Sequence, residues 1–85
     1  MKLKAQIEKE KYVNSLVFKA IAEAQEQDSL DKAEALLKKY LSPKFWMVYR
    51  GGSHIALHRN DLKGRIAIVY DAGREYIPEP AKGAA

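Results

Sequence analysis

The sequence predicts an α+β fold, with an N-terminal αα-hairpin packed on a three-stranded antiparallel β-meander in the order α-α-β-β-β. Up to residue 41, apolar residues recur at spacings of three and four, the period of an amphipathic helix. After Pro43 the period changes to two, the period of a half-buried strand. Three short strands need a cover over their apolar face, and the two helices supply it. The 85 residues suffice for one domain, expected over residues 1–77, and leave no room for a second core.

The first helix is expected over residues 3–27. Six apolar residues at helical spacing form its stripe: Val13, Leu16, Val17, Ala20, Ile21 and Ala24. Leu3 and Ile7 extend this stripe toward the N-terminus. A helix of this length exceeds the small sheet that it would cover, so it is also expected to support a homodimer.

The second helix is expected over residues 30–41. Asp28 or Ser29 can cap its N-terminus, because the side-chain oxygen of either residue can accept an unpaired backbone N–H. The helix ends at Ser42-Pro43, since the residue before a proline disfavours helical backbone. The link between the two helices is short, which favours an antiparallel hairpin.

Three strands are expected over residues 45–49, 53–59 and 65–70. A Gly51-Gly52 turn joins the first two, and a hairpin loop that ends at Gly64 joins the last two. One further strand segment and a tail are predicted at the C-terminal end of the chain. Residues 75–77 are expected to add a short edge segment, and the Pro-containing residues 78–85 to form a disordered tail.

Side-chain alternation assigns faces to these strands. In the second strand, Ile55 and Leu57 are expected on one face. The opposite face of that strand is expected to carry His54, Ala56 and His58. In the third strand, the residues expected to share one face are Ile66, Ile68 and Tyr70.

The composition narrows the classes of function. The chain has no cysteine, which excludes disulfides, zinc–thiolate sites and thiol nucleophiles, and no metal or cofactor is expected. No apolar run approaches the roughly 18–20 residues of a membrane span. The charged N-terminal segment lacks the apolar stretch of a signal peptide, so a cytoplasmic location is expected. The net charge of +4 permits a nucleic-acid partner without requiring one.

RNA cleavage through the 2′-hydroxyl group is a chemistry that these residue types could support, because it needs no metal ion. It needs a base near the hydroxyl group and positive charge near the phosphate. His54 is the candidate general acid or base. Gly51-Gly52 would let an RNA backbone approach closely, and Arg50, Lys63 and Arg65 would hold its phosphates.

The same residues also have a plainer interpretation, as a polar surface histidine beside a tight glycine turn. His58 lies four residues from His54 on one strand, which separates their Cα atoms by roughly 13–14 Å. The two rings therefore cannot share one small metal ion or act on one bond. Ser53 is expected on the face opposite His54, which argues against a nucleophilic serine.

One motif carries a family resemblance. Gly52-Ser53-His54 follows the run Phe45-Trp46-Met47-Val48-Tyr49-Arg50, with a lysine-ending helix before it and the strand Arg65-Ile66-Ala67-Ile68-Val69 after it. In this order, residues 33–77 resemble the HicA toxins, the mRNA-cleaving toxins of bacterial toxin–antitoxin pairs, which have a double-stranded-RNA-binding-domain-like fold.

The resemblance implies a ribonuclease with a cognate antitoxin as its protein partner and RNA as its substrate. It implies that His54 is the catalytic histidine. The residues expected to contact RNA are Arg50, Gly51, Gly52, Ser53, His58, Lys63 and Arg65. The chain departs from the family pattern at Asp71, where a second histidine is common, and at the C-terminus, where a Pro-rich tail replaces a helix.

An interaction module is the alternative function. In this interpretation the chain is a small phage- or plasmid-type inhibitor or adaptor without enzymatic activity. It would dock on a larger protein through its helix hairpin or the edge of its sheet. A substitution of His54 separates the two functions, because only the ribonuclease depends on that side chain.

Overall fold

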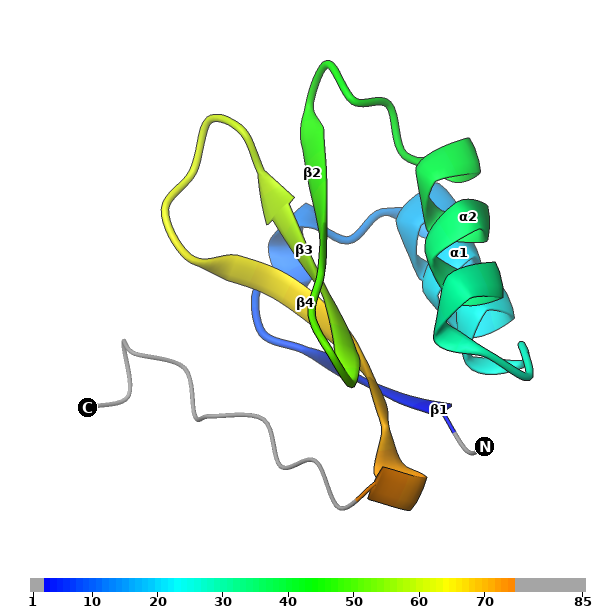
Figure 1. The fold of residues 1–85 in the computed structure, drawn as a ribbon. Coiled ribbons are helices and arrows are strands. Elements are labelled where there is room, and N and C mark those ends of the chain that lie inside the picture. Colours follow the sequence, from blue (N-terminus) through cyan, green and yellow to red (C-terminus); the bar gives the residue numbers. More distant parts are fainter. Residues whose placement is uncertain (1–2, 75–85) are drawn as a thin grey trace.

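The computed structural model describes residues 3–74 and confirms the α+β class (Figure 1). Two helices cover one face of an antiparallel sheet whose strand order is β1-β4-β3-β2. The strands are β1 (Leu3–Ile7), β2 (Trp46–Arg50), β3 (His54–Arg59) and β4 (Arg65–Asp71). The helices are α1 (Ser15–Gln25) and α2 (Leu30–Tyr40), with short 3-10 turns at η1 (Glu10–Tyr12) and η2 (Ala72–Arg74). The edge segment and tail expected over 75–85 lie outside the described residues.

Strand β1 corrects the sequence prediction, which placed residues 3–7 in the first helix. Leu3, Ala5 and Ile7 satisfy the alternation of a strand as well as the spacing of a helix. The tertiary structure decides between them, because β4 is a buried strand with a partner on each side, and β1 supplies one of these partners. The sheet therefore has four strands rather than three. Helix α1 is 11 residues long, which removes the excess length that led us to expect a homodimer.

The helix hairpin forms as predicted. Asn14 caps α1 by accepting the N–H of Val17 on its side-chain oxygen at 2.9 Å. Ser29 caps α2, and its Oγ accepts the N–H of Lys32 at 3.1 Å. Fully buried small residues let the helices approach each other and the sheet closely: Ala20, Ala24 and Ala33.

The core lies between the helices and the sheet. Its largest fully buried members are Leu37 of α2, Ile55 and Leu57 of β3, and Ile66 and Val69 of β4. Each side chain of this size stabilises the fold by about 1.5–3 kcal/mol when it leaves water. The predicted inward face of β3 is thereby confirmed.

A β-bulge in β4 changes one predicted face. The register pairs Leu57 with Ala67 but His58 with Arg65, so Ile66 is an extra residue. Ile66 therefore joins the apolar cluster beneath the helices instead of sharing a face with Ile68 and Tyr70. Gly64, just before the bulge, has a φ of 85°, a backbone conformation that glycine adopts readily.

Candidate nucleic-acid interface

The face of the sheet that points away from α1 and α2 carries His54, His58 and Arg65 among the candidate side chains. We call it the rear face. Strand register places the following residues on it: Lys4, Gln6, Met47, Tyr49, His54, Ala56, His58, Arg65, Ile68 and Tyr70. Within residues 3–74, no helix covers this face.

His54 is the first residue of β3 and is partly buried against the preceding turn. A Cβ atom added at Gly51 would lie only 2.7 Å from Nδ1 and 2.8 Å from Nε2 of this ring. The backbone N–H of Gly51 also donates to the carbonyl oxygen of His54 at 2.8 Å. The missing side chain of Gly51 was expected to let an RNA backbone approach, but it makes room for the imidazole ring of His54 instead.

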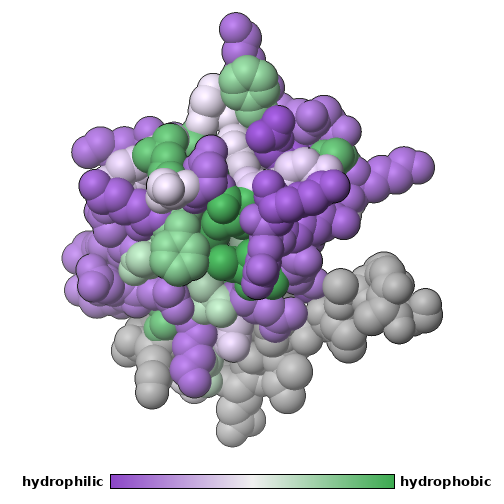
Figure 2. Space-filling model, turned by 180° about the vertical axis from the view of Figure 1, so that it is seen from behind, coloured by the Kyte–Doolittle hydropathy of each residue, from purple (hydrophilic) through white to green (hydrophobic). Residues whose placement is uncertain are grey.

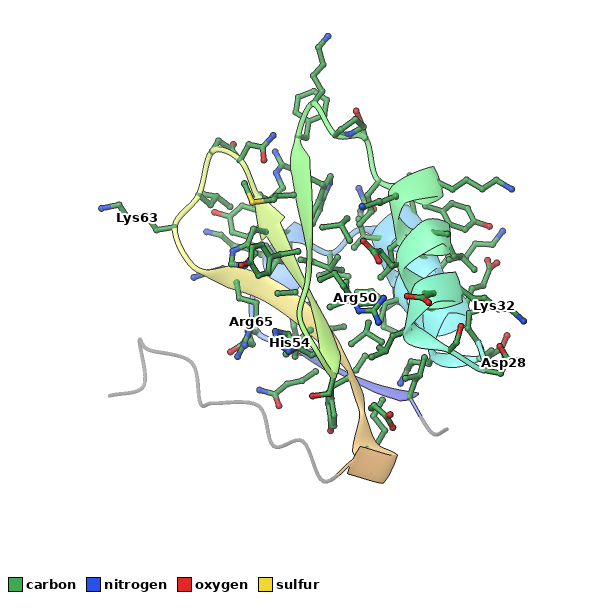
Figure 3. All side chains as sticks on the ribbon, viewed as in Figure 1. Asp28, Lys32, Arg50, His54, Lys63 and Arg65 are labelled. Atoms are coloured by element: carbon green, nitrogen blue, oxygen red, sulfur yellow. The ribbon has the colours of Figure 1, made fainter. Side chains whose placement is uncertain are left out.

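The surroundings of His54 keep its ring neutral near pH 7. Burial lowers the pKa of the imidazole below its ordinary value of 6.5, and the positive charge of Arg65 lowers it further. Figure 3 shows the two side chains on the same side of the sheet. A neutral imidazole can accept a proton, which is what a general base must do.

Arg65 is held by an acidic residue that the sequence analysis did not identify. Its Nε donates to Oε1 of Glu8, whose side chain is only 5% exposed. Glu8 lies within the helix predicted over residues 3–27, and that prediction gave no reason to place it beside the third strand. This ion pair fixes the position of the Arg65 side chain and reduces its net charge at the rear face.

Arg50 lies on the other side of the sheet, away from His54. Its Nη1 donates to Oδ1 of Asp31 at 2.6 Å and to Oε1 of Glu34 at 3.2 Å, and its Nε donates to the carbonyl oxygen of Gly51 at 3.0 Å. Arg50 thereby ties β2 to α2. Its neighbours in the sequence suggested a phosphate contact, but strand alternation directs the even-numbered residues of β2 toward the helices.

The remaining predicted contacts are scattered. Lys63 is exposed in the loop between β3 and β4 and points away from His54 (Figure 3). His58 shares the rear face with His54 but lies at the other end of β3. Gly52 is exposed in the turn, and the Ser53 carbonyl oxygen accepts the N–H of Asp71 at 3.0 Å.

Two exposed side chains on the rear face were not among the predicted site residues. Tyr49 is 60% exposed and lies opposite Ala56, and Met47 is 53% exposed and lies opposite His58. The alternation within the strand gave the missing signal, since Trp46 is buried and its odd-numbered neighbours must point the other way.

Asp71 replaces the second histidine that the family resemblance implies. It is buried, and its Oδ1 accepts the backbone N–H of Gly73 at 2.9 Å. This contact gives Asp71 a structural role at the end of β4.

The remaining observations concern metal binding, membrane-spanning helices and similarity to known proteins. Among residues 3–74, no group of three His, Cys, Asp or Glu side chains is placed to hold a metal ion. Neither α1 nor α2 has the length and apolar character needed to cross a membrane. Comparison with protein-family models, curated proteins and solved structures finds no match to this chain.

Proposed function

We propose that this protein binds RNA on its rear face and cleaves it without a metal ion, with His54 as the general acid or base. One observation carries the proposal: a partly buried imidazole, whose pKa is lowered by burial and by the positive charge of Arg65, lies on a face that also exposes Tyr49. The resemblance to the HicA toxins supports it, because α2, β2, β3 and β4 follow one another in the order which that resemblance implies. A protein with this activity would act on mRNA in the cytoplasm and be controlled by an antitoxin.

The proposed reaction is a transesterification within the RNA strand. His54 takes the proton of a 2′-hydroxyl group, and the 2′-oxygen forms a bond to the adjacent phosphorus. The bond from phosphorus to the 5′-oxygen breaks, and the His54 imidazolium returns its proton to that leaving oxygen. The products are a 2′,3′-cyclic phosphate and a 5′-hydroxyl group. Arg65 would stabilise the negative charge that develops on the phosphate oxygens.

Tyr49 would position the substrate. An exposed aromatic ring can stack on an unpaired base, which contributes about 1–3 kcal/mol per base. Its cross-strand neighbour on β3 is Ala56, a small residue, and the Tyr49 side chain itself is 60% exposed. We therefore expect a single-stranded region of RNA to be bound.

RNA binding and cleavage by matched histidine variants test the proposal. His54→Gln should abolish cleavage, whereas His58→Gln, on the same strand and face, should retain most of it. Binding by the wild-type protein should weaken steeply as salt rises, because cations released from the RNA drive association. Circular dichroism should show that both variants remain folded. Full cleavage by His54→Gln would rule out the catalytic role.

Exposed apolar side chains on α1 favour a second candidate function. Leu16 and Phe18 lie on the outer surface of this helix rather than in the core. Docking on a larger protein would cover them, as the interaction-module hypothesis requires. A protein with this function would not cleave RNA, and its activity would not depend on His54.

A further inference from the structure

A groove runs between strand β1 and helix α1, on a side of the molecule that does not include His54. Its volume is about 290 Å³. Ala5 and Ile7 of β1 line it together with Phe18, Ile21 and Ala22 of α1. Seen from behind, an apolar area interrupts the hydrophilic surface of the protein (Figure 2). Phe18 is 60% exposed at this groove, so most of a large apolar ring is in contact with solvent.

The outer edge of β1 adjoins this groove. The N–H of Glu8 donates to the carbonyl oxygen of Ile66 at 2.8 Å, so the even-numbered residues of β1 form the hydrogen bonds to β4. Leu3, Ala5 and Ile7 therefore direct their N–H and C=O groups outward. Within residues 3–74, no strand pairs with this edge. Two of these residues, Ala5 and Ile7, also line the groove with their side chains.

Strand β1 lacks the usual protection of an exposed edge. It has no proline and no bulge, and Lys4 is its one charged residue. Natural sheets normally block such an edge with several charges, a proline or a covering segment. An unblocked edge beside an apolar groove is the arrangement that binds an added strand, where backbone bonds supply affinity and pockets select alternate side chains.

The charges around the groove indicate what kind of strand would bind. Glu10 is the one charged residue that lines the groove itself, so apolar side chains suit the groove. Lys4 is exposed on the other face of β1 and is the one charged residue of that strand. An added strand would place alternate side chains on that face beside Lys4, which favours acidic residues at those positions.

We propose that the groove binds an extended, acidic segment of a partner protein, which adds to β1 as a fifth strand. Alternate apolar side chains of that segment enter the groove against Phe18 and Ile21. The acidic side chains between them point to the opposite side of the sheet, toward Lys4. The groove itself lies on the face of the sheet opposite to His54, so the proposal holds whether or not the protein cleaves RNA.

A synthetic peptide probe tests the proposal. The probe is a ten-residue peptide of alternating valine and glutamate with both ends blocked, titrated into the ¹⁵N-labelled full chain. Saturable shifts are expected at the amides of Ala5 and Ile7, with slower hydrogen exchange at both. Phe18→Ala should weaken binding about tenfold, the loss typical of an aromatic contact at the centre of an interface. Phe45→Ala is the matched control, because Phe45 is 53% exposed at the far end of the sheet, and it should leave binding unchanged.

Two control peptides separate the parts of the proposal. A valine–lysine peptide should bind more weakly than the valine–glutamate peptide, and a peptide methylated on its edge-facing amides should not bind. Absence of shifts at about 2 mM peptide would overturn the proposal, as would equal binding of the valine–lysine peptide. A Phe18-dependent dimer of the chain in sedimentation experiments would also overturn it, because the groove would then hold a second copy.

Discussion

Gly51→Ala is a steric probe of His54 that leaves the histidine itself unchanged. The added Cβ would lie 2.7–2.8 Å from the two ring nitrogens, whereas ordinary contacts begin at 3.4 Å. The Cε1 atom between these nitrogens would be closer still, at 2.2 Å, so the ring must retreat by more than an ångström or rotate away from the turn. Gly51 does not have a positive φ, so the backbone accepts alanine without strain. The substitution should thus act on the imidazole ring alone.

The magnitude follows from two opposing effects. Replacing a glycine in a compatible backbone conformation stabilises a protein by about 0.4–1 kcal/mol, because the unfolded chain loses freedom. Overpacking against the ring costs about 1–3 kcal/mol. Gly52→Ala is the matched control, since a Cβ there meets nothing within 4 Å. Gly51→Ala should accordingly be about 1–3 kcal/mol less stable than Gly52→Ala in urea unfolding.

The pKa of His54 is the more direct measurement. Burial is the main cause of its lowered pKa, so a displaced ring should titrate closer to 6.5. The ring Cε1–H signals report this in an NMR titration, and the chain has only two histidines to resolve. A His54 pKa that is the same in Gly51→Ala as in the wild type would refute the reasoning.

Three further predictions follow from the packing and the ion pairs. The free energy of unfolding should decrease as the pH falls below about 6.5, because His54 binds a proton more readily in the unfolded chain. In urea titrations at pH 5–7.5, His54→Gln should remove this part of the pH dependence. Glu34→Gln should destabilise the fold more than Asp31→Asn, by about 1 kcal/mol or less, because the Glu34 side chain is 22% exposed and the Asp31 side chain is 86% exposed. Double-mutant cycles with Arg50→Met measure the coupling energy of each ion pair. Equal coupling energies for the two pairs would contradict this order. Leu37→Ala should cost about 2–5 kcal/mol in the same assay, since its side chain is fully buried at the centre of the core, and a loss below 1 kcal/mol would show that the helices pack loosely.

The sequence predicted the helix hairpin and three of the four strands because their signals are local. Capping at Ser29, the break at Pro43 and the alternation from Trp46 onward each depend on neighbouring residues. Strand β1 could not be assigned in this way. Its five residues fit either period, and only pairing with β4, more than 60 residues later, selects the strand.

The candidate site was predictable residue by residue only along β3. Alternation correctly placed His54 and His58 on one face. The position of Arg65 depends on a bulge and on Glu8, and neither leaves a local signal in the sequence. The prediction for Arg50 was wrong although a local signal was present. Its closeness to His54 in the sequence suggested a shared site, but the alternation of side chains along β2 directs Arg50 toward α2.

The measurement that tests the central claim most directly is cleavage of a 5′-labelled single-stranded RNA in the presence of EDTA, with product ends identified by mass spectrometry. The wild-type protein should produce 2′,3′-cyclic phosphate ends and leave the same RNA intact when its 2′-hydroxyl groups are methylated. His54→Gln should produce none. Cleavage of the methylated RNA, or no cleavage of either RNA by the wild-type protein, would contradict the proposal that His54 activates a 2′-hydroxyl group.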